Sequence, residues 1–575
     1  MRRRDFLKKI PIAAGASLTL NSIPVRVMAE KGHFLRLAES STNDRVLIIL
    51  QLHGGNDGLN TLIPVDQYDL YYSRRANIAI PARNSVRKYI PLDSTLPLED
   101  QVGLHPDMID AKDLYDRGRM GIVQGVSYPN NNGSHFRGRD IWHMGGGPDD
   151  YYSSGWVGRY LQQEISPQIY PDDFPNSNCP DPLAIEMGSD VSLVFHQPGN
   201  IPTSISLAGT PDSFANLVEN LEGFDDQLID PRGKPPTNLD NTPYGKEMNW
   251  ILGLEDKSED YAARLKAVYD ASSASSVTYP EVYPFNAPTG SLRNPLSSQL
   301  QIVARLLAGG GAGQGVGTKV FMLRIGGFDT HAGQVEGYDP TMGAHATKLY
   351  HISAAMKAFQ NDLKARGLED RVLTVTTSEF GRRIDSNGSF GTDHGTGGPM
   401  MIFGKGVNPG ITGTNQDLSN RERNVQMQYD YRQVYANILK DWMQVDEEVI
   451  ANDIFFGNFI DGPKEDGGFY EPLPVAVEQI TSTEGFFKDR FKINKIYPNP
   501  AAGKTNISYF INTENQVNIQ LFDLRGRLIK VLINERKTAG EHNQQLDLRG
   551  IESGTYILKL ESGLLKESMK LIIRE

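Results

Sequence analysis

Four short stretches of this sequence are predominantly apolar, and each is followed by polar residues or glycine. They are Val46–Leu50, Met120–Val126, Val320–Ile325 and Val372–Thr376. A strand that is apolar at nearly every position is buried on both faces, which is typical of a parallel sheet covered by helices. Helical patterns lie between these stretches, one beginning at Asn294-Pro295 and another ending at Gly367. We therefore predict an α/β body with a mostly parallel sheet flanked by helices, whose chemistry lies in loops beyond the carboxyl ends of the strands.

The chain has 575 residues, which is long enough for more than one folding unit. We predict an α/β domain over residues 30–480, in which residues 200–290, rich in Asn, Asp, Pro and Ser, form a cap or insertion. Residues 481–494 are predicted to be a linker. Residues 495–575 alternate apolar and polar positions between turn residues, which is typical of a small all-β sandwich.

Composition excludes several classes of protein. The net charge is −12 and both ends are net positive, so the middle of the chain carries an excess of carboxylates, which disfavours nucleic acid as a partner. Cys179 is the single cysteine, so a disulfide within the chain and a thiolate-rich metal site are excluded. Any metal must be held by histidine and carboxylate. The longest apolar runs are shorter than the ~18 residues that a membrane span requires, so we predict no transmembrane segment.

Residues 1–29 have the pattern of an export signal. An arginine run, Arg2-Arg3-Arg4, precedes Phe6-Leu7-Lys8, and a mildly apolar stretch then ends in small residues near Ala29. This segment resembles a twin-arginine (Tat) signal peptide, which implies that the chain crosses into the periplasm already folded. An ordinary basic amphipathic helix is the alternative interpretation.

Two glycine-rich or polar loops offer groups for catalysis and metal binding. Asp57 follows the first strand between glycines, and a turn whose carboxylate caps the backbone is the alternative for it. A second loop offers a hydroxyl, an imidazole and two guanidinium groups, which is what nucleophilic attack on an anionic ester requires. These residues are Ser134, His135, Arg137 and Arg139. A helix N-cap serine followed by surface arginines is the alternative.

Two further loops supply carboxylates and imidazoles. Asp329 and His331 follow the third strand at positions whose side chains point the same way in an extended segment, so both can reach one ion. Glu379 follows the fourth strand, and Asp393-His394 precede another apolar stretch. A lone Asp-x-His arises often by chance, but all four loops are expected at one edge of the sheet, which favours a functional site.

In order, the motifs H-G-G-N-D-G-L-N, S-H-F-R-G-R-D, G-G-F-D-T-H and S-E-F-G-R with G-T-D-H-G-T-G-G resemble the domain-of-unknown-function 1501 family. This family is a Tat-exported branch of the alkaline phosphatase and sulfatase superfamily, and the resemblance covers residues 44–460. It implies an alkaline-phosphatase-like fold with Ser134 as nucleophile. It also implies a ligand set for one or two metal ions, which we predict to be Asp57, Asp329, His331, Glu379, Asp393 and His394.

The sequence departs from the superfamily pattern at Phe380, which stands where a second histidine is expected beside Glu379. One predicted site, made of Asp329, His331 and His394, therefore has its nitrogen ligands. The other, made of Asp57 and Glu379, lacks one. Two alternatives to a two-metal site are therefore kept: a site that holds one ion, and a carboxylate site that binds Mg²⁺ or Ca²⁺.

The C-terminal segment resembles the type-A sorting domain of the type IX secretion system of Bacteroidota. The resemblance rests on Tyr497-Pro498-Asn499-Pro500, on the turn Phe522–Arg527, and on the final strand beginning at Gly554. It implies transfer across the outer membrane and removal of the tail. A carbohydrate-binding sandwich is the alternative.

Taken together, the sequence predicts an exported hydrolase of phosphate or sulfate esters that uses one or two divalent ions, Zn²⁺ or Ca²⁺, Mg²⁺ or Mn²⁺. In this interpretation Ser134 and His135 act at the reacting ester, and Arg137 or Arg139 holds the anion. The expected substrate is a small anionic ester or a sulfated or phosphorylated glycan. The expected partners are the Tat and type IX machineries, and the expected location is the periplasm and then the cell surface or the medium. The alternative is a non-catalytic surface protein of the same fold that binds a glycan or a protein partner.

Overall fold

The protein is described by a computed structural model. It covers residues 43–83, 85–219, 243–288, 291–311, 313–419, 422–464, 467–476, 492–511, 515–523, 527–538, 540–562 and 565–574, with the backbone of residues 18–20 and 23–25. The chain forms two compact units, residues 1–478 and residues 479–575, which we describe separately.

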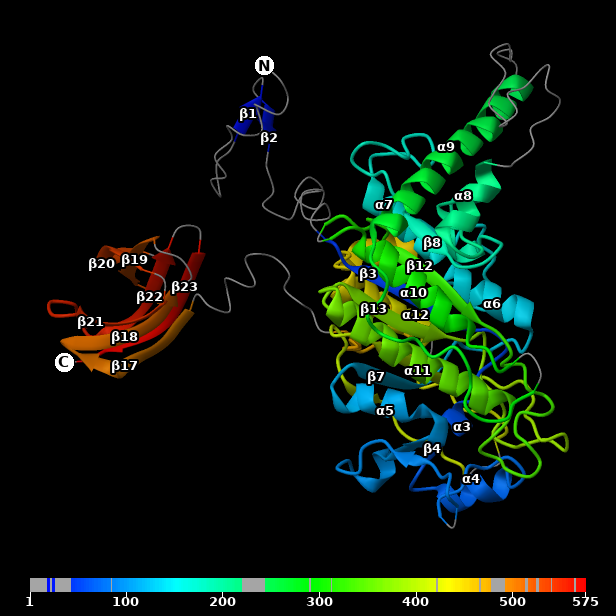
Figure 1. Ribbon diagram of the computed structural model, residues 1–575. Coiled ribbons are helices and arrows are strands. Elements are labelled where there is room, and N and C mark those ends of the chain that lie inside the picture. Colours follow the sequence, from blue (N-terminus) through cyan, green and yellow to red (C-terminus); the bar gives the residue numbers. More distant parts are fainter. Residues whose placement is uncertain are drawn as a thin grey trace. The chain divides into compact units, whose positions relative to one another are not determined.

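The first unit is built on a nine-stranded sheet, seen at the centre of the body in Figure 1. The strand order is β11-β8-β12-β3-β13-β14-β7-β15, and β16 also pairs with β7. In this order the strands span Ser204–Ser206, Ala184–Glu186, Val320–Ile325, Val46–Leu52, Val372–Thr377, Gly398–Phe403, Met120–Ser127 and Gly410–Thr412, and β16 spans Tyr429–Asp430. Neighbouring strands run parallel except around β14, which is antiparallel to both β13 and β7.

The central strand β3 explains why a continuous apolar run was a reliable signal. Val46, Ile48 and Leu50 pack into one hydrophobic core, while Leu47 and Ile49 point to the opposite face and pack into a second core. All seven residues of the strand are buried. Each face of the sheet has its own core. If polar residues alternated with apolar ones along β3, the polar side chains would enter one of these cores without water or a hydrogen-bond partner.

Helices cover both faces of the sheet (Figure 1). The first core receives α5 (Ile109–Asp116), α10 (Pro295–Ala308) and α11 (Ala344–Ala365). The second receives α6 (His135–Met144), α7 (Trp156–Ile165), α12 (Tyr431–Asn437) and the segment Ile438–Trp442 that continues it. The predicted start of α10 is confirmed, since the Asn294 side chain accepts a hydrogen bond from the backbone N–H of Leu296 at 3.1 Å and Pro295 occupies the first turn.

Smaller elements complete the first unit. A three-stranded sheet joins β4, β6 and β5, and β9 pairs with β10. Their bounds and those of the short helices are β4 Leu62–Pro64, β5 Ile90–Pro91, β6 Val102–Leu104, β9 His196–Gln197, β10 Ile201–Pro202, α3 Gly58–Thr61, α4 Tyr68–Arg74 and α13 Glu447–Val449, with single turns at Leu98–Asp100, Pro106–Met108, Leu193–Phe195 and Ile450–Ile454.

Several segments assigned from the sequence lie wholly or partly outside the described residues. Of the predicted signal peptide, the structure gives only the paired strands β1 (Leu18–Leu20) and β2 (Ile23–Val25). The predicted cap contains α8 (Pro211–Glu219) and α9 (Pro243–Ala271), with residues 220–242 outside the description. Most of the predicted linker is also outside it. The domain boundaries remain a prediction.

The second unit is an antiparallel β structure with its own core. Its strand order is β20-β19-β22-β23-β17-β18-β21. Alternate residues such as Val517, Ile519 and Leu521 face inward and meet Leu558 and Leu560 of the partner strand. The strands are β17 Lys492–Ala502, β18 Lys504–Ile511, β19 Asn515–Phe522, β20 Leu528–Lys537, β21 Gly540–Asp547, β22 Gly554–Ser562 and β23 Leu565–Ile573.

The predicted fold class is confirmed. The first unit has a mostly parallel sheet flanked by helices, and the second is all-β. Within the described part of the chain, we find no helix with the length and apolar character needed to span a bilayer.

Asp57 is at the centre of a buried polar network rather than in an open loop. Its carboxylate caps α3 and receives both terminal nitrogens of Arg75, at 3.0 Å and 2.9 Å. Gln334 Nε2 donates to the same carboxylate at 2.5 Å. Burial acts to raise the pKa of Asp57, but the charge of Arg75 and the hydrogen bonds outweigh it, so the pKa is lowered. Both side chains of the ion pair are fully buried.

Breaking this pair should cost much of the stability of the first unit. In Arg75→Ala, Asp57 keeps its place in the interior but loses its counter-ion, and we expect the free energy of unfolding to fall by about 3–5 kcal/mol. Urea unfolding followed by tryptophan fluorescence measures this in the full chain, because all four tryptophans lie in the first unit.

The matched control is Arg117→Ala. This change breaks an exposed ion pair between Asp113 in α5 and Arg117, the residue that follows the helix. The free energy of unfolding should fall by only ~0.2–1 kcal/mol or less in this variant. Equal losses in the two variants would show that the buried pair does not stabilise the fold in the way described.

Candidate metal centre

The loops that carry the candidate residues meet at one edge of the sheet. The edge is formed by the carboxyl ends of the parallel strands β3, β7, β12 and β13, and by the start of β14, which runs the other way. The segments that arrive there are residues 53–58, 128–135, 326–331, 378–383 and 391–397. The sequence-based placement of the site at this edge agrees with the structure.

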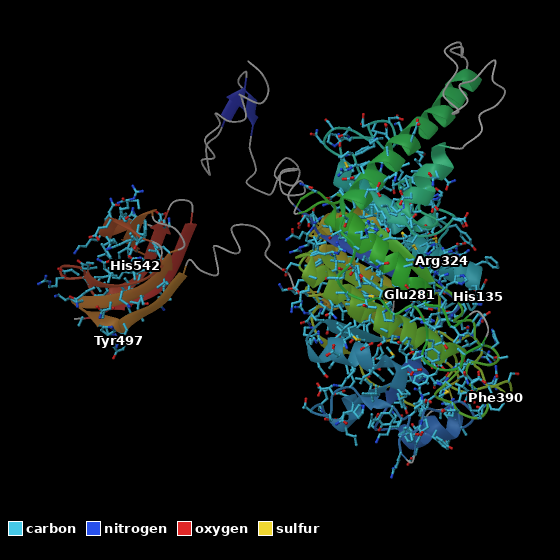
Figure 2. All side chains as sticks on the ribbon, in the orientation of Figure 1. His135, Glu281, Arg324, Phe390, Tyr497 and His542 are labelled. Carbon is cyan, nitrogen blue, oxygen red and sulfur yellow. The ribbon has the colours of Figure 1, made fainter. Side chains whose placement is uncertain are left out.

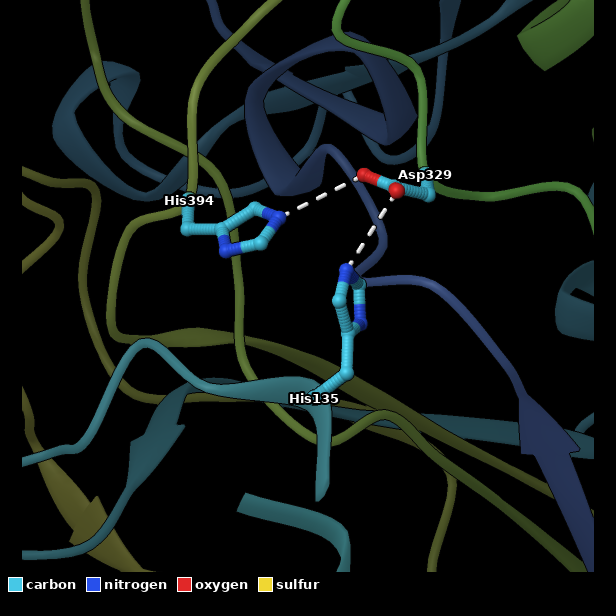
Figure 3. A group of neighbouring side chains, drawn as sticks. All are labelled: His135, Asp329 and His394. Atoms are coloured by element: carbon cyan, nitrogen blue, oxygen red, sulfur yellow. Dashed lines mark hydrogen bonds and ion pairs between the residues drawn. The ribbon is translucent and has the colours of Figure 1, made fainter. Parts of the chain in front are cut away.

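Asp329 lies at the focus of this edge. The Nε2 atom of His135 is 3.3 Å from Asp329 Oδ2, and the Nε2 atoms of His331 and His394 are each 3.3 Å from Oδ1. Figure 3 shows His135 and His394 pointing at the carboxylate from two different loops. The side chain of Asp329 is 48% exposed, so the cluster can be reached from solvent.

Each of these imidazoles has an acceptor behind it. His135 Nδ1 lies 2.8 Å from Glu379 Oε1, and His394 Nδ1 lies 2.7 Å from the carbonyl oxygen of Gly133. His331 Nδ1 lies 3.5 Å from Asp393 Oδ1. An acceptor at Nδ1 places the proton there and leaves a lone pair on Nε2, which is the arrangement that orients histidine ligands in metal sites.

The separations in the cluster fit a metal ion. The His331 and His394 Nε2 atoms are 2.9 Å apart, and candidate ligand atoms of His135, Asp329 and His394 all lie within 4.8 Å of one another. Nitrogen and oxygen ligands about 2.0–2.2 Å from one ion stand roughly 3.0–3.5 Å from each other. Three imidazole nitrogens and a carboxylate converge here. The structure therefore contains a possible His/Asp metal site.

The protonation states also fit. Burial lowers the pKa of His394, so its imidazole is neutral at neutral pH and can donate a lone pair. Partial burial acts to raise the pKa of Asp329. The contacts with Arg382 and His394 outweigh this effect and lower the pKa to about 2, so the carboxylate is charged. A charged carboxylate beside the neutral imidazole of His394 is the form that binds a divalent cation.

Arg382 fixes Asp329 from behind. This buried guanidinium donates to Asp329 Oδ1 at 2.8 Å and to the carbonyl oxygens of Gly55 at 2.8 Å and Phe328 at 2.9 Å. It also bonds the carbonyl oxygen of Gly54. Arg382 therefore ties the loop after β3 to the loop after β12.

The glycine pair after β3 permits this close approach. A Cβ on Gly54 would lie 2.2 Å from the backbone nitrogen of Asp329, and one on Gly55 would lie 2.5 Å from the ring of Phe380. Both residues also have positive φ, 124° and 88°. The Phe380 ring is buried and lies beneath two of the imidazoles, with its centroid 4.9 Å from that of His135 and 4.4 Å from that of His394.

The loop after β12 and the connection between β13 and β14 are joined by backbone hydrogen bonds. The N–H of Gln334 donates to the carbonyl oxygen of Phe390 at 2.9 Å, and that of Thr392 donates to Thr330 at 3.1 Å. The Asn387 side chain donates to the carbonyl oxygen of His331 at 2.9 Å. These bonds hold His331 and His394 at a fixed separation.

The structure separates the predicted ligands into three groups. Asp329, His331 and His394 come together as predicted, whereas Glu379 and Asp393 stand behind imidazoles and contact their Nδ1 atoms. Asp57 faces Arg75 and Gln334 instead of the cluster. Its buried ion pair could not be seen in the sequence, because Arg75 is eighteen residues away.

The residues of the predicted catalytic loop have different surroundings in the structure. Ser134 is the N-cap of α6, where its exposed hydroxyl accepts from the backbone N–H of Arg137 at 3.5 Å. Arg137 donates to the carbonyl oxygens of Pro148 and Asp150, which accounts for its guanidinium. His135 enters the cluster as a candidate ligand. The sequence places His135 beside a loop at the end of a strand, which indicated a role in the site. The order of residues in that loop did not show whether His135 is a metal ligand or a catalytic residue.

Comparison with known families agrees with two resemblances read from the sequence, to the domain-of-unknown-function 1501 family and to the sorting domain. Residues 239–454 match the family model described as "Protein of unknown function (DUF1501)". Residues 495–574 match the secretion system C-terminal sorting domain. This domain implies export through the type IX machinery to the cell surface or the extracellular space.

Similarity to individual proteins is more distant. A search of curated proteins gave no match for this chain. Among solved structures, the PsFucS1 sulfatase from Pseudoalteromonas sp. matches with 10% identity and a TM-score of 0.32, over 89% of this chain and 88% of the sulfatase. The phosphonate monoester hydrolase SpPMH from Silicibacter pomeroyi matches with 11% identity and a TM-score of 0.22, over 92% and 89%.

A third match is PorZ, a surface component of the type IX secretion system of Porphyromonas gingivalis. It has 17% identity and a TM-score of 0.12, and the match covers 16% of this chain and 13% of PorZ. All three TM-scores are below 0.5. The fold assignment therefore depends on the strand order of the sheet.

Glu379 provides a test of how the centre is oriented. In Glu379→Gln, His135 loses the charged acceptor that fixes its tautomer, and we expect the affinity for Zn²⁺ or Mn²⁺ to fall about 10–100-fold. Competition with a chromophoric chelator measures the affinity. The control is Glu186→Gln, which alters a buried carboxylate of β8 bonded to Ser192. Equal metal affinity in the wild type and Glu379→Gln would contradict the orienting role.

Proposed function

We propose that this chain is an exported, metal-dependent hydrolase of phosphate or sulfate esters. The observation that supports this most directly is the convergence of the Nε2 atoms of His135, His331 and His394 on Asp329, each imidazole having an acceptor at Nδ1. A purely structural cluster has no need for three imidazoles whose Nε2 atoms all face one carboxylate.

The proposed centre holds one divalent ion. Its ligands are His135, His331, His394 and Asp329, a nitrogen-rich set that suits Zn²⁺ or Mn²⁺ better than Ca²⁺ or Mg²⁺. A second ion at Asp57 is left out of the proposal, because Arg75 already neutralises that carboxylate. When bound, the ion supplies Lewis-acid polarisation of an ester oxygen.

Ser134 is the proposed nucleophile. It directly precedes the ligand His135, its hydroxyl is exposed, and it stands at the N-terminus of α6, where backbone N–H groups favour an anion. In this scheme Ser134 Oγ attacks phosphorus or sulfur and the alcohol leaves. Water then releases the phosphate or sulfate from the serine.

A second candidate function is a non-catalytic surface protein of the same fold that binds a glycan or a protein. The observations that favour it are Phe380 at a position where a histidine ligand was expected and the ion pair that occupies Asp57. Metal content separates the two candidates. About one tightly held ion per chain supports the hydrolase, and none after reconstitution with Zn²⁺ or Mn²⁺ supports the binding protein.

Ligand and nucleophile variants should behave differently. We expect His394→Ala to lose bound metal and activity together, because a nitrogen ligand is removed, with a loss of metal affinity of at least ~10–100-fold. We expect Ser134→Ala to keep its metal and lose turnover of aryl phosphates or aryl sulfates. Plasma mass spectrometry gives metal content and a chromogenic assay gives turnover.

The control for these variants is His196→Ala, which removes an imidazole bonded to Asn200 and should change neither quantity. If His394→Ala retains full metal, the ligand assignment is wrong. If Ser134→Ala turns over at the wild-type rate, Ser134 is not the nucleophile.

The proposed Tat route concerns residues outside the described part of the chain. Arg3→Lys combined with Arg4→Lys should block export, because an ammonium group cannot reproduce the planar fork of a guanidinium. Fractionation of cells followed by immunoblotting measures export. Normal surface display of the double variant would show that another pathway carries the protein across the inner membrane.

A further inference from the structure

A second pocket lies at the same edge of the main sheet, on the side of β7 and β15. Its walls come from the loop after β3, the start of β14, the carboxyl-terminal half of β7 and the loop after β15. This edge also carries His135, which is labelled in Figure 2. The pocket shares no residue with the smaller one that Arg139 lines together with His143 and Glu379.

The lining of this second pocket is uncharged but rich in hydrogen-bonding groups. None of its lining residues is ionisable, and leucine, proline and valine side chains supply an apolar wall. The polar wall consists of four carboxamides and one hydroxyl, which belong to Gln124, Asn415, Gln416, Gln428 and Thr414. Such a lining favours a ligand group that is uncharged, forms hydrogen bonds and carries a small apolar part.

Two of the carboxamides have an atom that is buried and unpaired. Gln124 Nε2 and Asn415 Oδ1 have no hydrogen-bond partner within the described part of the chain. The orientation of the Asn415 side chain is fixed, because its Nδ2 donates to Asp66 Oδ1 at 2.8 Å and to the carbonyl oxygen of Gln101 at 3.0 Å. One donor and one acceptor are therefore unused in the same pocket. Unpaired buried groups are costly, which favours a ligand that supplies one acceptor and one donor.

The loop after β15 is held against Gln124 within the fold. Gln428 Oε1 accepts from the backbone N–H of Thr414 at 2.8 Å, and Gln428 Nε2 donates to the carbonyl oxygen of Thr414 at 2.9 Å. A Cβ on Gly413 would lie 2.9 Å from Gln428 Oε1 and 3.3 Å from the Cβ of Gln124. The glycine therefore permits the close approach, and the wall that carries Asn415 is in place before a ligand binds.

The size of the pocket suits a terminal group better than a chain. Its volume is about 30 Å³, which is room for roughly two water molecules, and it is partly open to solvent. The oxygen and the methyl group of an acetamido substituent fill a space of that size. A hydroxyl group has no methyl for the apolar wall. A peptide group contains the same amide, but it is flanked by a substituted carbon on each side.

We propose that this pocket binds the N-acetyl group of an amino sugar. Gln124 Nε2 donates to the acetamido oxygen, Asn415 Oδ1 accepts from the acetamido N–H, and the methyl group contacts the apolar wall. The proposal does not depend on the hydrolase function, because no lining residue is a candidate metal ligand. Gly397, which lines the pocket, follows His394 by three residues, so their Cα atoms are at most ~11 Å apart. A short oligosaccharide can span that distance.

The test compares two sugars that differ at one ring position. Binding of N-acetylglucosamine and of glucose to the full chain is measured by isothermal titration calorimetry. We expect N-acetylglucosamine to bind at least about 10-fold more tightly, because the acetamido group adds two hydrogen bonds and a methyl contact. Saturation-transfer NMR should show the strongest transfer at the acetyl methyl protons.

The variant Gln124→Met removes the unpaired donor and keeps a side chain of similar length. We expect it to weaken binding of N-acetylglucosamine about 3–10-fold, because one hydrogen bond is lost. Its melting temperature should stay at or above that of the wild type, since the removed donor has no partner in the free protein. The control is Gln162→Met, the same change at an exposed position of α7, which should leave the affinity unchanged.

Three results would overturn the proposal: equal affinity for N-acetylglucosamine and glucose, no binding of either sugar, or wild-type affinity in Gln124→Met. A fourth comes from N-acetylalanine methylamide, a capped amino acid. If this compound binds more tightly than N-acetylglucosamine, the pocket recognises a peptide and not a sugar.

A chelator separates this proposal from the hydrolase proposal. The affinity for N-acetylglucosamine should be the same with and without excess EDTA, and its loss in EDTA would place the sugar at the metal cluster and overturn the pocket assignment. If the chain holds no metal and the sugar still binds, the hydrolase proposal fails and the acetamido pocket stands. If metal and turnover are present but the sugar does not bind, the pocket assignment alone is wrong.

Discussion

The contact between Arg382 and Asp329 determines how the functional edge of the first unit is built. Arg382 is buried and bonds backbone carbonyls of the loops after β3 and β12, so its position is set by the sheet. Asp329 is held by that guanidinium at 2.8 Å while its other side faces solvent. The imidazoles of His135, His331 and His394 then gather around a carboxylate that cannot retreat into the protein. Without Arg382, the carbonyl oxygens of Gly55 and Phe328 would lose the guanidinium that joins their two loops.

Much of the fold could be predicted because its signals are local. The apolar run Val46–Leu52 is buried on both faces, and Asn294-Pro295 begins α10 where capping chemistry places the start. The sorting domain was recognised from short motifs and confirmed by its family. These features depend on a few consecutive residues, so their physics is visible in one stretch of sequence.

The candidate site was only partly predictable, because its pairings join distant residues. Asp57 was expected at a metal, yet Arg75 occupies its carboxylate, and only the path of the chain after α3 brings the two together. Glu379 and His135 are 244 residues apart, so their contact could not be read from spacing. Arg137 and Arg139 are equivalent in the sequence. The structure distinguishes them because the loop at Pro148 and Asp150 folds back onto Arg137.

The hydrogen bonds between the loop after β12 and the β13–β14 connection have a consequence for the cost of binding. Gln334 bonds Phe390, Thr392 bonds Thr330, and Asn387 bonds His331, so hydrogen bonds join the two segments to each other. A ligand shell assembled from independent loops would lose conformational entropy each time an ion entered, at ~1–2 kcal/mol for each backbone residue that becomes ordered. Here that ordering is completed during folding. The proposed centre would therefore be preorganised, and exchange of an ion there would be governed by desolvation and charge rather than by rearrangement of the chain.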